Sequence, residues 1–106
     1  MIEQDHWVYV VELEPEAWES AYVGVVYVGE TALTPEERLA KHISGARTAA
    51  RVVTRRGRRL RTDLGPTGQP FTSRDEALEW EERTANDLRE AGYRVFGGQG
   101  KTFMSD

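Results

Sequence analysis

Two valine-rich runs near the start of the sequence constrain the fold more than any other feature. The first reads HWVYVVEL over residues 6–13, and the second reads AYVGVVYVG over residues 21–29. β-Branched and aromatic residues of this kind favour buried strands. Pro15 interrupts the first run and the connection to the second is short, which makes an antiparallel hairpin the natural pairing. The chain is therefore expected to fold around a β-hairpin.

The residues after the hairpin predict a helix. Thr34 can cap its N-terminus, and Glu37 completes a capping box with it. Gly45 is expected to end the helix, because glycine readily adopts the left-handed conformation that follows a last helical turn. Leu39 and Ile43 lie one turn apart, so both are predicted to face the core.

The middle of the chain carries weaker patterns. Residues 46–53 are compatible with a short helix, and residues 58–64 with an edge strand that follows Gly57. The run GPTGQP over residues 65–70 is rich in glycine and proline and predicts a loop.

A second capping box starts the longest predicted helix. Ser73 is its N-cap, Glu76 is the partner in the box, and the helix is expected to run to about Ala91. A last short strand is expected over residues 93–96. The order strand–strand–helix–(helix)–strand–helix–strand indicates an α+β domain, with a short mixed or antiparallel sheet flanked by helices.

Composition excludes several classes of protein. The chain has 106 residues, enough for one domain, which we expect over residues 1–96 with a flexible tail over 97–106. It has no cysteine, which excludes disulfides, thiolate zinc sites and cysteine nucleophiles, and its two histidines exclude a metal cage of several histidines. The sequence has neither an apolar run of the ~20 residues that span a membrane nor a signal-peptide pattern. We therefore expect a cytoplasmic protein that does not contact membranes.

The net charge of −4 conceals a strong segregation of charge. Between Arg38 and Thr62 there is no acidic residue, whereas nine of the fourteen basic residues lie there. Arginine suits bidentate contact with phosphate, so this block indicates a polyanion as partner. It also fits a solvated loop whose arginines pair with acids elsewhere on the surface. The candidate nucleic-acid-binding residues are Arg47, Arg51, Arg55, Arg56, Arg58, Arg59 and Arg61.

Charged side chains in the two predicted helices suggest chemistry. Glu81 is the acid in the less polar stripe of the long helix, which also holds Ala77, Thr84, Ala85 and Leu88. A carboxylate turned toward the protein body needs a cation, which is either a metal ion or an arginine such as Arg38. On the first helix, Arg38 and His42 lie one turn apart and form a candidate phosphate clamp. His42 also fits an ordinary surface or helix-end position.

The order of these residues resembles that of the GIY-YIG nucleases. The segments that carry the resemblance are Val8–Tyr9, Tyr27–Thr31, Arg38–His42 and Ala77–Glu81. The resemblance implies a small GIY-YIG-like fold that hydrolyses phosphodiester bonds with one divalent metal ion, Mg²⁺ or Mn²⁺. It also implies the catalytic residues. Tyr9 and Tyr27 would be the paired strand tyrosines, Arg38 the catalytic arginine, His42 its helical neighbour, and Glu81 the metal ligand.

The sequence departs from the pattern of this family at several places. Trp7 stands where the family has glycine, and Tyr93 stands near the place where the family often carries asparagine. The interval between Tyr9 and Tyr27 is longer than usual in the family. Tyr22 would shorten it, so the choice between Tyr22 and Tyr27 stays open, although Tyr27 fits the downstream motif better.

The leading hypothesis is a single-domain, metal-dependent endonuclease of the GIY-YIG type. Its arginine block would hold a nucleic-acid backbone without reading sequence, and DNA is expected in preference to RNA. One alternative is a catalytically inactive nucleic-acid-binding module with the same fold. Another is a protein-interaction domain whose acidic surface docks a basic partner. A protein partner or a homodimer stays open as well.

Overall fold

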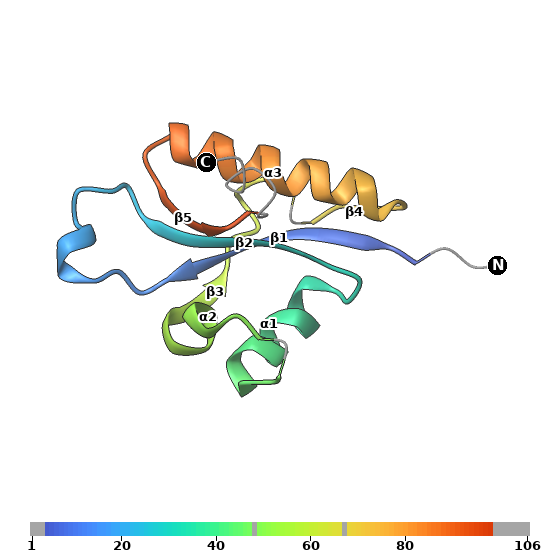
Figure 1. The fold of residues 1–106 in the computed structure, drawn as a ribbon, viewed down its shortest axis with the longest axis horizontal. Coiled ribbons are helices and arrows are strands. Elements are labelled where there is room, and N and C mark those ends of the chain that lie inside the picture. Colours follow the sequence, from blue (N-terminus) through green and yellow to red (C-terminus); the bar gives the residue numbers. More distant parts are fainter. Residues whose placement is uncertain (1–3, 48, 67, 99–106) are drawn as a thin grey trace.

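A mixed β-sheet separates one long helix from two shorter ones (Figure 1). The computed structural model describes residues 4–47, 49–66 and 68–98, and within them the sheet has five strands. The strands are β1 (His6–Leu13), β2 (Val25–Thr31), β3 (Gly57–Leu60), β4 (Pro70–Phe71) and β5 (Arg94–Gly97). The helices are α1 (Pro35–Ser44), α2 (Arg51–Arg56) and α3 (Arg74–Glu90), and a 3₁₀ turn η1 (Ala17–Glu19) joins β1 to β2.

The predicted hairpin forms the centre of this sheet. β1 and β2 are antiparallel, and Tyr9 lies opposite Gly29 in their register. The strand order is β3-β1-β2-β5, and β4 also pairs with β1, at His6 and Trp7. β5 runs parallel to β2, so the sheet is mixed. The structure thus confirms an α+β domain with a mixed sheet flanked by helices.

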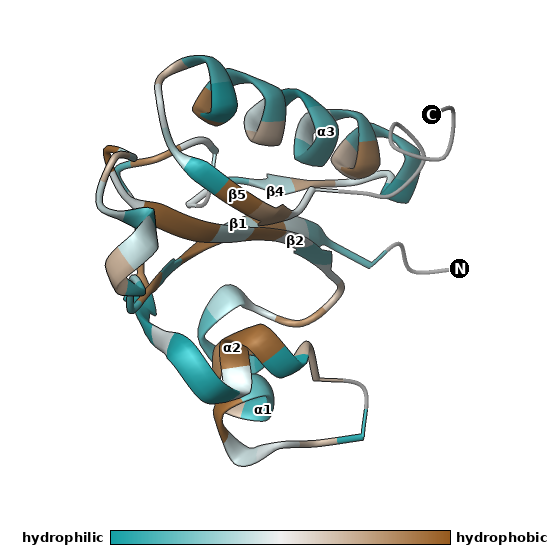
Figure 2. Cartoon of the chain, turned by 60° about the vertical axis from the view of Figure 1, so that its left-hand side comes forward, coloured by the Kyte–Doolittle hydropathy of each residue, from teal (hydrophilic) through white to brown (hydrophobic). Residues whose placement is uncertain are grey.

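Alternate residues of the central strands face opposite helical layers. The core cluster on the α3 side contains Val8, Val10, Val26, Val28, Ala77, Ala85 and Leu88. The cluster on the side of α1 and α2 contains Tyr9, Val11, Leu13, Val25 and Val53. Figure 2 shows the largely hydrophobic strands, in brown, between these two helical layers. The side chain of Tyr9 is therefore directed toward α1 and away from α3.

The predicted capping signals at the helix ends are largely confirmed. Thr34 accepts a hydrogen bond from the Glu37 N–H at 3.2 Å, and the Glu37 carboxylate accepts one from the Thr34 N–H at 3.1 Å. Gly45 ends α1 with a φ of 77°, a left-handed conformation that favours glycine. At the start of α3, Ser73 accepts a hydrogen bond from the Glu76 N–H. These local signals fix both long helices.

Several predicted boundaries were wrong. β2 starts at Val25 rather than at residue 21, because η1 and the turn after it occupy the preceding residues. The short helix covers residues 51–56 rather than 46–53, and the edge strand ends at residue 60 rather than 64. β4 overlaps the end of the predicted loop, and β5 is shifted one residue beyond the predicted range. Most of the predicted tail, residues 99–106, lies outside the described residues.

The prediction that Ile43 faces the core was also wrong. Ile43 is 49% exposed, whereas Leu39 packs against the core as expected. His42 takes the inward position of that turn and is completely buried. Neighbouring residues of an α-helix point about 100° apart, so Ile43 is turned toward solvent. No helix in the described part of the chain has the length and apolar character that crossing a membrane requires.

Candidate active site

The phenol of Tyr9 is built into the middle of the hairpin. The Tyr9 residue is only 1% exposed and lies opposite Gly29. A Cβ atom at Gly29 would lie 2.5 Å from the Tyr9 hydroxyl oxygen, so the tyrosine crosses the bare backbone of this glycine. Any larger residue at position 29 would push the phenol aside. This contact gives a physical reason for a glycine at position 29, at the end of the second valine-rich run.

Replacing Gly29 by alanine is expected to displace the Tyr9 phenol. Overpacking of this kind costs about 1–3 kcal/mol of unfolding free energy, which chemical denaturation followed by circular dichroism measures. Gly68→Ala is the matched control, because no atom lies within 4 Å of a Cβ atom built there. Equal unfolding free energies for Gly29→Ala and the unaltered chain would contradict this packing.

His42 orients the Tyr9 hydroxyl. The imidazole Nδ1 accepts a hydrogen bond from the backbone N–H of Ala50 at 2.9 Å, so the proton of the neutral ring resides on Nε2. Nε2 then donates to the Tyr9 hydroxyl oxygen at 2.8 Å. Burial, and then the nearby charge of Arg38, lower the pKa of His42 to about 4. At neutral pH the ring is therefore uncharged, and both of its nitrogens are used inside the protein.

Tyr27 and Arg38 complete a cluster around this pair. The Tyr27 ring lies 6.1 Å from the Tyr9 ring and 5.6 Å, edge-on, from the His42 ring, measured between ring centroids. Burial raises the pKa of both phenols, and the Arg38 guanidinium, which hydrogen-bonds to Tyr9, opposes this rise. In the chain alone burial outweighs Arg38, so a phenolate at this site requires additional positive charge. Tyr27 is half-buried and is the more accessible of the two phenols.

Glu81 reaches the interior from α3, as its position in the helical stripe predicted. The residue is 6% exposed, and within the described chain its Oε1 atom has no hydrogen-bond partner. Burial, and then the charge of Glu30, raise the pKa of Glu81 to about 7, while Arg74 acts in the opposite direction. A buried carboxylate oxygen without a partner is costly and is a suitable ligand for a hard cation such as Mg²⁺. This residue therefore fits the expected metal ion.

The raised pKa of Glu81 predicts a pH dependence of stability. Between its ordinary value of 4.5 and about 7, the folded chain holds a proton that the unfolded chain has lost. The contribution of Glu81 to stability is therefore full below pH 4.5 and is lost as the pH rises to about 7. Glu81→Gln should lack this decline in urea unfolding experiments. The comparison with this variant is needed because His42, whose pKa is lowered, produces the opposite slope over an overlapping range. Parallel pH profiles for both proteins would contradict the burial of the carboxylate.

Glu81 lies on α3, whereas the phenols of Tyr9 and Tyr27 face the other side of the sheet. The charge of Glu81 nevertheless reaches both phenols. β5 pairs with β2 only as far as Val28, and Gly97 and Gly98, both with positive φ, then turn the chain. The negative charge of Glu81 raises the pKa of both Tyr9 and Tyr27, so the carboxylate acts on the phenols from the α3 side. The Glu81 carboxylate therefore lies within electrostatic range of both phenols.

Glu30 is a neighbour of this site that the sequence did not single out. Its carboxylate lies 2.9 Å from Nδ1 of His6 and 3.7 Å from Nε of Arg74, and its charge raises the pKa of Glu81. The alternation of side chains along β2 places it on the α3 side, which could have indicated this position from the sequence. Among the described residues there is no group of three or more metal-ligating side chains, so a metal ion here would have few protein ligands.

The positions that depart from the pattern of the GIY-YIG nucleases do not complete the site. Trp7 pairs with Thr31 at the end of the hairpin and is half-buried. Tyr22 is 41% exposed and precedes β2, whereas Tyr27 contacts Tyr9 and His42. The structure therefore favours Tyr27 over Tyr22 as the partner of Tyr9. Tyr93 packs against the hydrophobic cluster on the α3 side.

The seven arginines of the basic block do not act alike. Arg56 pairs with the buried carboxylate of Glu19, which also binds Arg94, and this network joins η1, α2 and β5. Three further arginines of the block form ion pairs, which are Arg58 with Glu12 and Glu14, Arg59 with Glu12, and Arg61 with Asp63. These four arginines thus pair with acids, as the alternative interpretation expects, but three of them lie in α2 and β3 instead of a solvated loop, and Glu19 is buried. The remaining three are exposed.

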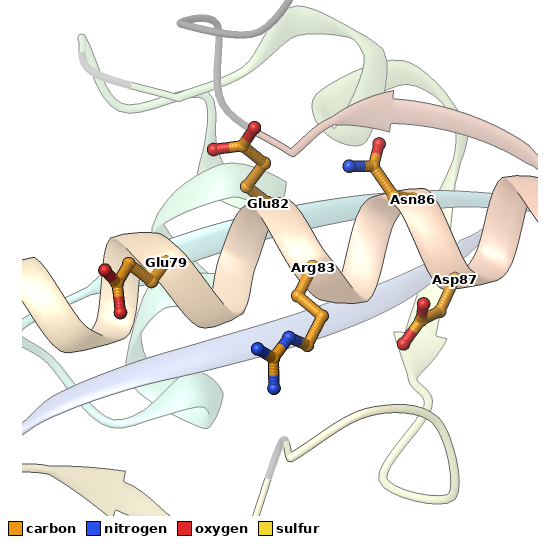
Figure 3. A pocket seen from close by; sticks show the side chains of 5 residues that line it. All are labelled: Glu79, Glu82, Arg83, Asn86 and Asp87. Atoms are coloured by element: carbon orange, nitrogen blue, oxygen red, sulfur yellow. The ribbon is translucent and has the colours of Figure 1, made fainter.

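A shallow hollow lies on the outward face of α3, and none of the predicted site residues lines it. It is lined by Glu79, Glu82, Arg83, Asn86 and Asp87. Figure 3 shows that these side chains fan outward from the helix instead of converging on one point. This arrangement is that of a solvated, mainly acidic helix face.

The comparisons with known proteins assign no family to the chain. No protein-family model, no curated protein and no solved structure matches it. The functional conclusion therefore rests on the residues themselves.

Proposed function

We propose that this chain is a metal-dependent endonuclease of the GIY-YIG type that hydrolyses phosphodiester bonds in nucleic acid. The observation that carries the proposal is a single cluster, in which two phenols and a guanidinium lie near a buried carboxylate with an unpartnered oxygen. The sequence predicts each of these groups for this chemistry. The proximity of the strand phenols to a carboxylate from α3 supports this prediction.

Glu81 is the residue that would hold the metal ion. Its hard carboxylate oxygen suits Mg²⁺ or Mn²⁺, and a bound ion would polarise the phosphate and stabilise the leaving oxygen. With one carboxylate, or two if Glu30 also contributes, most positions around an ion stay open for water and substrate.

The chain's own side chains supply the remaining functions. Arg38 would neutralise charge that develops on the phosphate oxygens. Tyr27, as the more accessible phenol, would accept a proton from the attacking water once its pKa is lowered by the positive charge around it. Tyr9 is held by His42 and is buried, so its role would be to position Tyr27 and Arg38. His42 would act through Tyr9 and not on the substrate.

One alternative function has an observation in its favour. Burial raises the pKa of both phenols, which would suit a nucleic-acid-binding module that kept this architecture without the chemistry. The two functions differ in whether bound nucleic acid is cut.

A cleavage assay separates them. The protein is incubated with labelled DNA and RNA in the presence of Mg²⁺ or Mn²⁺, and in parallel with chelator. The proposal predicts cleavage that stops when chelator is added. Binding without cleavage in every metal condition would support the inactive module, and cleavage that survives chelator would point to a contaminating nuclease.

A further inference from the structure

Five arginines of the basic block are exposed, and two of them, Arg58 and Arg59, form ion pairs with Glu12. Arg47, Arg51 and Arg55 line one groove together with the turn after α1 and with Thr54 of α2. None of the described residues that line this groove is acidic. Within the part of the chain that the structure describes, these three arginines form no ion pair, unlike the other four of the block.

The groove is joined to the candidate active site by hydrogen bonds to His42. Ala50, which precedes α2, donates its backbone N–H to Nδ1 of His42, and the Thr54 hydroxyl donates to the His42 carbonyl at 2.6 Å. The same imidazole donates to Tyr9. The helix that carries Arg51 and Arg55 is therefore held in a fixed relation to the clustered phenols.

The charge of the opposite layer orients an approaching polyanion. The outward face of α3 carries Glu79, Glu82 and Asp87, on the other side of the sheet from α2 (Figures 1 and 3). Acidic side chains repel phosphate, whereas exposed arginines attract it over several ångströms. A nucleic acid that approaches this molecule is therefore directed toward α2.

We infer that the groove of Arg47, Arg51 and Arg55 binds the phosphate backbone of the nucleic acid that the proposed active site cuts. This inference rests on the proposed function. Unpaired guanidinium groups keep their donors free for bidentate contacts with phosphate oxygens. Arg58 and Arg59 share their guanidinium donors with Glu12, and Arg56 is tied to Glu19, so these residues contribute less to binding.

The salt dependence of binding tests this assignment. Binding of a fluorescent DNA duplex, and separately of RNA, is measured in chelator, which prevents cleavage, at several salt concentrations. The variant Arg47→Ala/Arg51→Ala/Arg55→Ala is compared with the matched control Arg58→Ala/Arg59→Ala. Each phosphate contact contributes about 0.9 to the slope of log affinity against log salt for duplex DNA, so the first variant should flatten the slope by about 2.7. The control should change it by much less.

Further results distinguish the possible failures. The variant Arg47→Lys/Arg51→Lys/Arg55→Lys should keep most of the slope. This result would show that the alanine variant loses binding through its lost charge and not through unfolding. An unchanged slope in the alanine variant, or a larger change in the control, would overturn the inference. Binding that depends on the three arginines without any cleavage would leave the inference intact while the proposed nuclease activity fails. Absence of binding to both DNA and RNA would overturn it outright.

Discussion

Replacing Arg38 by alanine is expected to lower the rate of metal-dependent cleavage by about 10²–10³-fold, the usual effect of removing one preorganised group that stabilises developing charge. Arg38 hydrogen-bonds to Tyr9, and its charge lowers the pKa of both phenols. Its loss would remove the cation proposed to face the phosphate, and would raise the pKa of the group proposed to accept the proton.

Kinetics and spectroscopy check this prediction together. The loss should appear mainly in kcat, because the charge is needed most in the transition state. The circular dichroism spectrum should not change. Arg89→Ala is the matched control, because Arg89 is an exposed arginine on α3. A variant at position 38 that cleaves normally, or that unfolds, would show that Arg38 has a different role.

Replacing Glu81 by glutamine is expected to lower cleavage by about 10³-fold at saturating Mg²⁺, because the metal ion that Glu81 is proposed to hold would supply several kcal/mol of transition-state stabilisation as a Lewis acid. Glutamine keeps the shape of the side chain and removes its charge. The variant should be at least as stable as the unaltered chain above pH 7, since it avoids a buried charge whose pKa is raised to about 7.

Loss of activity together with retained stability is the diagnostic combination. Cleavage by the unaltered chain should also rise as the pH increases through about 7, the raised pKa of Glu81. The reason is that a carboxylate must lose its proton before it binds metal. Equal cleavage by Glu81→Gln and the unaltered chain would remove Glu81 from the mechanism.

Local signals in the sequence predicted the elements that the structure confirms. The capping residues Thr34, Gly45 and Ser73 act on backbone groups within a few residues of themselves, so their effect can be recognised from sequence alone. The burial of Glu81 followed from the 3.6-residue helical period. Glu81 shares this face with Ala77, Thr84, Ala85 and Leu88, which are all buried.

Long-range contacts explain what the sequence could not show. The spacing from Leu39 predicts Ile43 in the core, but the sequence does not reveal that His42 takes the inward position, where it donates to Tyr9 of the distant strand β1. The sequence does not distinguish most of the paired arginines of the block from the others, because Glu12, Glu14 and Glu19 lie far away in sequence. Pro70 and Phe71 form a strand only because β1 offers them an edge. Tertiary pairing of this kind overrides local preference.

The binding of a divalent ion by Glu81 is the central claim, and a titration with Mn²⁺ followed by electron paramagnetic resonance tests it most directly. The matched control is Glu79→Gln, which removes an exposed acid of the same helix. The unaltered chain and this control should bind Mn²⁺ equally, while Glu81→Gln should bind it at least about tenfold more weakly, since even residues that only support a metal ligand have effects of this size. Equal affinity of all three proteins for Mn²⁺ would contradict the claim.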